Sequence, residues 1–98
     1  MSKIHSESTD RLFEAILSLK SAEECYDFFE DLCTIKELKD LSLRLEVASM
    51  LREGRSYQEV TKETGVSAAT ICRVKKCVEY GNGGYRLVLD RLAEEDIH

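Results

Sequence analysis

The residues best suited to chemistry in this chain lie between positions 68 and 76, where small, hydroxyl and cationic side chains follow one another. Ala68 and Ala69 are small enough to let a helix backbone approach base edges in the major groove of DNA. The Thr70 methyl can contact a thymine methyl, and its hydroxyl can donate or accept a hydrogen bond. Cations able to reach phosphates or bases come next, and they are Arg73, Lys75 and Lys76. This order predicts the N-terminal end of a helix that reads DNA.

Two short helices joined by a tight turn would position these side chains. Ser56 and Glu59 have the spacing of a capping box, which begins a helix. Gly65 can adopt the left-handed conformation that ends that helix, and Ser67 is a favourable N-cap for the next. The second helix turns Ile71, Val74 and Val78 inward, at spacings of three and four. Residues 56–79 are therefore predicted to form a helix-turn-helix, with these candidate DNA-binding residues: Ser56, Gln58, Ser67, Ala68, Ala69, Thr70, Arg73, Lys75 and Lys76.

The charge distribution favours the same interpretation. The 98-residue chain has a net charge of −5, which by itself argues against a polyanionic partner. From position 52 to position 86, however, seven basic residues stand against four acidic ones, a local net charge of +3. The rest of the chain carries −8. A basic reading segment on an acidic body predicts weak non-specific affinity and an oriented approach to DNA.

Length and composition exclude several classes of protein. Ninety-eight residues make one domain, expected to span 1–98. No stretch approaches a membrane span and no signal peptide is evident, so the protein is expected to be cytoplasmic, with no membrane partner. The four cysteines form no C-x-x-C pair, so no metal site is expected and the thiols are expected to be reduced and buried. No nucleophile stands beside a base, and no enzyme is expected.

Zero prolines and few early glycines indicate an all-α chain. A first helix is expected near Thr9, with Leu12, Phe13, Ile16 and Leu17 on one side. Ser21 with Glu24, and Thr34 with Glu37, form two further capping boxes, and the second opens a long helix that ends near Arg52. The glycine-rich segment 81–84 is expected to be a hinge before a last helix at about 84–93.

The long central helix carries apolar residues on more than one stripe, including Leu38, Leu41, Leu45 and Ala48 on the first and Leu43, Val47 and Met50 on the second. One subunit has too few other helices to cover both stripes. We therefore expect the helices at about 9–53 to pack against a second copy in an obligate homodimer. Two reading helices would then enter successive major grooves about 34 Å apart on a pseudo-palindromic operator.

The run from Gly65 to Arg73, and the helix from Leu41 to Gly54, resemble the Trp repressor superfamily. With Arg55-Ser56-Tyr57 and Tyr80-Gly81-Asn82-Gly83-Gly84-Tyr85, the chain is most similar to the YerC/YecD family of Trp-repressor-related proteins, over roughly residues 8 to 93. The resemblance implies a six-helix, intertwined homodimer that represses transcription. It also implies an amino-acid effector held by Arg44 and Arg73, with the Thr34 backbone assisting.

Two departures from that pattern concern the effector. Val74 stands where the tryptophan repressor has a glycine, and Cys77 replaces a serine that holds the amino group of the ligand. Because valine would crowd a flat indole, tryptophan is not expected. Another amino acid such as histidine, or no effector at all, remains open. In the alternative without an effector, Arg44 pairs with Asp40 or Glu37 at helical spacing and Arg73 contacts a phosphate.

Two other functions stay open at this stage. The chain could be a helical protein-interaction module whose helix-turn-helix no longer binds DNA, or a DNA-binding protein that works without a corepressor.

Overall fold

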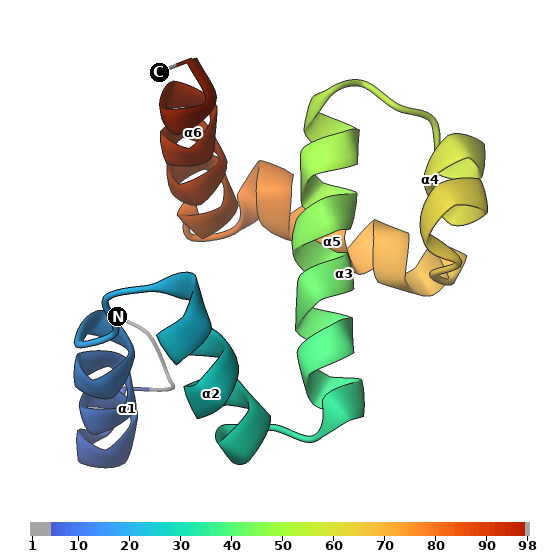
Figure 1. Cartoon of the computed structure of the whole chain (residues 1–98). Helices are drawn as coiled ribbons and strands as arrows, with labels where there is room; N and C mark the ends of the chain where they lie inside the picture. The colour runs from blue at the N-terminus through green and yellow to red at the C-terminus, as the bar shows by residue number, and fades with distance from the viewer. Residues whose placement is uncertain (1–4, 98) are drawn as a thin grey trace. The chain divides into compact units, whose positions relative to one another are not determined.

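The computed structural model describes residues 5–97, and these form six α-helices without a strand (Figure 1). The helices are α1 (Glu7–Leu17), α2 (Ala22–Leu32), α3 (Ile35–Arg52), α4 (Tyr57–Thr64), α5 (Ala68–Tyr80) and α6 (Gly84–Ile97). The predicted all-α fold is confirmed. The last helix runs four residues past its expected end.

The chain divides into two units, one up to Leu38 and the other from Lys39 onward. The prediction of a single domain over 1–98 stays a prediction.

Side-chain caps begin the helices of the first unit. The Ser6 hydroxyl accepts the Thr9 N–H at 3.1 Å, so α1 starts two residues before the expected Thr9. The Ser21 hydroxyl caps α2 as expected, but the Glu24 carboxylate accepts the N–H of Lys20 at 2.9 Å, so this capping box is incomplete.

The third predicted capping box opens α3 and is complete. The Glu37 carboxylate accepts the Thr34 N–H at 2.9 Å, and the Thr34 hydroxyl accepts the Glu37 N–H at 3.0 Å. The Thr34 N–H, followed by the Thr34 hydroxyl, lowers the pKa of Glu37. Two side chains three positions apart therefore fix where the longest helix begins.

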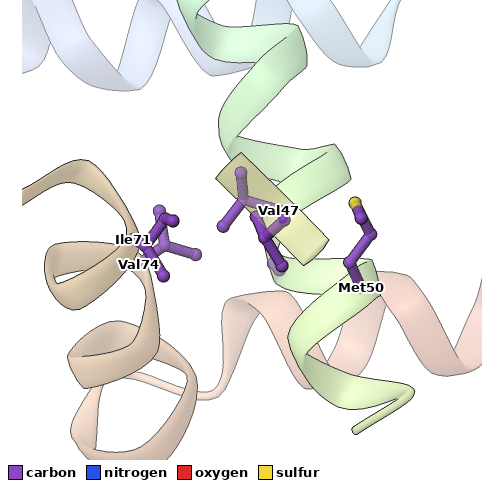
Figure 2. Packing of buried hydrophobic residues seen from close by; sticks show 6 residues of the cluster. Val47, Met50, Ile71 and Val74 are labelled. Carbon is purple, nitrogen blue, oxygen red and sulfur yellow. The ribbon is translucent and has the colours of Figure 1, made fainter. Parts of the chain in front are cut away.

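The core of the second unit is formed by side chains of three helices. Its buried members are Val47, Ala48 and Met50 of α3, Val60 of α4, and Ile71 and Val74 of α5. Figure 2 shows Ile71 and Val74 facing Val47 across the gap between α5 and α3. Tyr85 and Leu89 of α6 pack against this cluster. The packing holds α5 across α3.

Many apolar side chains stay exposed in the single chain. None in α1 or α2 is fully buried, and Phe13 and Leu17, which were expected to lie on one side of α1 with Leu12 and Ile16, are 51% and 83% exposed. On α3, Leu41 and Leu45 of the first stripe are also exposed. The prediction that the thiols are buried was wrong for this chain, since Cys25, Cys72 and Cys77 are exposed and Cys33 is half-buried. The spacing of apolar residues predicts which face of a helix avoids water, but it does not predict which neighbouring element covers that face.

The glycine-rich segment is a short turn, Gly81–Gly83, between α5 and α6. Arg52 of α3 pairs with Asp90 and donates to the Arg86 carbonyl oxygen at 3.3 Å, which attaches α6 to the end of α3. On one side of the expected hinge, α6 is therefore held in place by an ion pair and apolar packing.

Among the described helices, none has the length and apolar character that a membrane crossing requires.

Candidate nucleic-acid interface

The first helix of the predicted motif begins at the complete capping box of Ser56 and Glu59. The Ser56 hydroxyl accepts the Glu59 N–H at 3.2 Å, and the Glu59 carboxylate accepts the Ser56 N–H at 3.3 Å. Arg55 donates from Nε to the same carboxylate at 2.8 Å. The hydrogen bond from Arg55, followed by those from Ser56, lowers the pKa of Glu59. The start of α4 is thus fixed by three neighbouring side chains.

The turn between the two helices has the backbone that the sequence predicts. Gly65 has φ = 74° and donates its N–H to the Thr61 carbonyl at 2.8 Å, ending α4. The Thr64 hydroxyl donates to the Val60 carbonyl at 2.7 Å and accepts the Val66 N–H at 3.3 Å. Val66 is half-buried and packs against the core. A residue with a Cβ would be strained at Gly65, because L-residues rarely adopt this φ.

The second helix, α5, begins at Ser67 as predicted. The Ser67 hydroxyl accepts the Thr70 N–H at 3.2 Å and lies 3.1 Å from the Thr70 hydroxyl. Thr70 is half-buried, whereas Ala68 and Ala69 are exposed. The Thr70 hydroxyl therefore has one hydrogen-bond partner within the cap.

The outward face of α5 lies opposite its two buried residues, Ile71 and Val74. With 100° per residue, the positions pointing away from the core are occupied by Ala69, Cys72, Arg73, Lys76 and Tyr80, all exposed. Cys72 was not among the predicted site residues, although its position four residues before Lys76 indicates this face. The face combines small side chains with two cations and has no acidic residue.

Lys75 and Gln58 flank this face. The Lys75 Nζ lies 5.4 Å from the centroid of the Tyr57 ring and 3.9 Å from the Glu79 carboxylate. Gln58 is exposed in the first turn of α4, and Ser56 is exposed before it. The structure therefore brings the predicted DNA-binding residues onto one helix-turn-helix. Their contacts with DNA stay a prediction.

Arg55 stabilises α4, the first helix of the predicted motif, and this role was not predicted from the sequence. Its guanidinium hydrogen-bonds Glu59 and Glu63, one and two turns along α4. These hydrogen bonds raise the pKa of Arg55. The spacing could have revealed this contact, since Glu59 and Glu63, four residues apart, lie on one side of α4, and Arg55 stands four residues before Glu59.

The three predicted effector residues lie on different parts of the chain. Thr34 is exposed in the first unit, while Arg44 is half-buried on α3 and Arg73 is exposed on α5, both in the second unit. A cavity of about 470 Å³ occurs in the second unit between the end of α3, the start of α4 and the later half of α5. None of the three residues lines it.

Within the described residues, no group of three or more His, Cys, Asp or Glu side chains is arranged to hold a metal ion. The interface consists of a capped pair of helices and a cationic face.

Comparison with known proteins gives this geometry a family. The family model described as Trp repressor protein matches residues 7–93. YerC of Bacillus subtilis (strain 168), itself uncharacterized, is 55% identical over 94 residues, which is 96% of this chain and 90% of YerC.

Two solved structures agree in fold. A TrpR-like protein from Eubacterium eligens ATCC 27750 superposes with a TM-score of 0.90 at 53% identity, covering 93% of this chain and 94% of that chain. A candidate Trp repressor from Staphylococcus aureus gives a TM-score of 0.90 at 47% identity, covering 93% and 91%. The resemblance inferred from Gly65–Arg73 and the glycine-rich segment is confirmed. The chain belongs to the Trp repressor family, a family of DNA-binding regulators.

Proposed function

We propose that the protein represses transcription by binding a pseudo-palindromic operator as a homodimer, with α5 of each subunit in a major groove. The observation that carries the proposal is the outward face of α5. Small residues open this helix, and two exposed cations, Arg73 and Lys76, follow on the same side. Small residues permit close approach to base edges, and the cations supply contacts to phosphates.

Rigid placement of α5 supports the proposal. Ile71 and Val74 are buried against α3, and the capped turn at Gly65–Ser67 fixes the entry to the helix. A reading helix must keep its angle to the groove, because base contacts depend on hydrogen-bond geometry. The buried side of α5 serves this requirement, and the outward side is left for the groove.

The exposed apolar side chains support a homodimer. Leu41 and Leu45 on α3, and Leu87, Val88 and Leu92 on α6, are between 37% and 50% exposed in the single chain. The largest apolar surfaces of soluble monomers are interaction sites in many cases. A second copy that covers these faces would bury them and also bring a second reading helix.

The proposal includes an amino-acid effector held between Arg44 and Arg73. Two guanidinium groups offer a bidentate site for a carboxylate. Val74 stands where the tryptophan repressor has a glycine and is buried beside Arg73, and we infer that its side chain would crowd an indole. If no amino acid binds while operator binding is tight, the protein is an effector-independent repressor.

Titration of the full-length protein against genomic fragments, at two salt concentrations, tests DNA binding. We expect selective binding of a few fragments at low salt, with an affinity that falls steeply as salt rises. Lys76→Ala should weaken all fragments alike and lower the salt slope by about one. Lys62→Ala, on an exposed position of α4, serves as the matched control. A folded protein that retains no fragment at low salt would support the interaction module instead.

A further inference from the structure

The cavity between α3, α4 and α5 has the features of a ligand site. Its volume of about 470 Å³ lies within the range of roughly 300–1,000 Å³ typical of small-molecule sites. It is formed by the end of α3, the turn that leads into α4, and the later half of α5. All these elements belong to the second unit.

Apolar side chains form part of the cavity wall. Leu51, Tyr57 and Val78 line it, are half-buried, and pack against the core cluster. Their contacts with the core hold these side chains in place, so the wall is already formed without a ligand. Such a wall favours a molecule with a small apolar body.

Two cations also line the cavity and have donors to spare. Arg55 uses Nε and Nη2 for Glu59 and Glu63, but its Nη1 lies 3.8 Å from a Glu53 oxygen, beyond hydrogen-bond distance. The Lys75 Nζ lies 3.9 Å from Glu79, also beyond that distance. Both groups can therefore donate to an anion at the cavity.

The charges around the cavity limit how negative that anion can be. Arg55 already faces the carboxylates of Glu53, Glu59 and Glu63, and Glu79 stands at the rim. The charged side chains that line the cavity itself are Arg55, Lys75 and Glu79, a net charge of +1, which one added negative charge would balance. A second negative charge would be repelled by the surrounding carboxylates.

We propose that this cavity binds a small monocarboxylic acid with an apolar body. The carboxylate accepts hydrogen bonds from Lys75 and Arg55, and the apolar body lies against Leu51, Tyr57 and Val78. The site is separate from Arg44 and Arg73, and it requires neither DNA nor a second subunit.

Chemical-shift titration of the ¹⁵N-labelled full-length protein with phenylacetate tests the site in the absence of DNA. We expect saturable shifts at the amides of Tyr57, Lys75 and Val78. Phenylacetamide, which has the same shape without the charge, should bind about tenfold more weakly, because a hydrogen bond to a charged group contributes about that factor. Inorganic phosphate should bind more weakly than phenylacetate.

Two variants give opposite outcomes. Lys75→Met keeps the stem but removes the charge, and should weaken phenylacetate binding about tenfold. Glu79→Gln removes a repelling charge, and should strengthen it. Lys62→Met, which removes an exposed lysine of α4 outside the cavity, should change nothing.

Equal binding of phenylacetate and phenylacetamide would overturn the proposal, as would phosphate binding at least as tightly. Shifts clustered around Arg44 and Arg73, or equal losses in Lys75→Met and Lys62→Met, would also overturn it. Because the titration contains no DNA, failure of the proposed repressor function would leave this result unaffected.

Discussion

Gly81, at the end of α5, has no room for a side chain. A Cβ there would lie 2.4 Å from the Cys77 carbonyl oxygen, which is backbone and cannot swing away. Gly84, three residues later, would place a Cβ in open space. The glycine that follows α5 and the glycine that begins α6 thus differ in what an added methyl group would meet.

Gly81→Ala should therefore destabilise the protein by about 1–3 kcal/mol, the usual effect of an added methyl that forces a backbone shift. Gly84→Ala should be neutral, or should stabilise by about 0.4–1 kcal/mol, because it restricts the unfolded chain. Urea unfolding followed by circular dichroism measures both. Equal stability of the two variants would show that the α5–α6 turn adapts without cost.

We expect Thr70 to contact DNA through its methyl group, because its hydroxyl has a partner in the Ser67 hydroxyl. Thr70→Val, which keeps a methyl in place, should retain most of the preference for the operator. Thr70→Ser, which loses it, should reduce discrimination by about 0.8 kcal/mol, the worth of one buried methyl-sized group. Competition titrations with operator and random DNA measure the difference. The reverse order of the two variants would assign base reading to the hydroxyl.

At the scale of helices, side chains close in sequence fix the residues at which α1 to α5 begin. The caps at Ser21, Thr34, Ser56 and Ser67 could be predicted because each acts over three residues. The start of α1 was missed by two residues, since Ser6 and Thr9 are both acceptable caps in the sequence.

Contacts between distant residues could not be predicted in this way. Arg52 and Asp90 are 38 residues apart, and Lys75 meets Tyr57 only because α5 crosses α3 beside the start of α4. No short pattern encodes either contact. The candidate DNA face was predictable from helix periodicity, whereas the cavity at Lys75 depends on tertiary packing.

The brace at the start of α4 gives a pH dependence of definite sign. The pKa of Glu59 is lowered from its ordinary value of 4.5 by the hydrogen bond from Arg55, followed by those from Ser56. A carboxyl with a lowered folded-state pKa contributes stability above its ordinary pKa, and that contribution is lost as pH falls through the folded value. The free energy of unfolding should therefore decrease below about pH 4.5.

Glu59→Gln should flatten this decrease, because glutamine does not titrate. Glu94→Gln, at an exposed position of α6, is the matched control and should leave the slope unchanged. Urea titrations between pH 3 and pH 7, roughly the range that spans carboxyl titration, measure the slope. An unchanged slope in Glu59→Gln would remove Glu59 from the account of acid stability.

For the whole molecule, the exposed leucines of α3 connect stability with assembly. If a second copy covers Leu45, then Leu45→Glu should unfold the chain instead of releasing a folded monomer, because an obligate dimer has no stable single subunit. Lys39→Glu adds negative charge to an exposed position of the same helix and should remain dimeric. Sedimentation together with circular dichroism measures both. A soluble, fully helical Leu45→Glu monomer would contradict obligate dimerisation.

The account as a whole depends on two copies of α5 reading one operator. A hydroxyl-radical footprint on a fragment selected by the full-length protein measures this arrangement directly. We predict two protected patches on one face of the duplex, with centres about 10 base pairs apart, because two-fold-related reading helices enter successive major grooves. A single patch, or uniform protection along the fragment, would contradict the proposed dimeric reading of DNA.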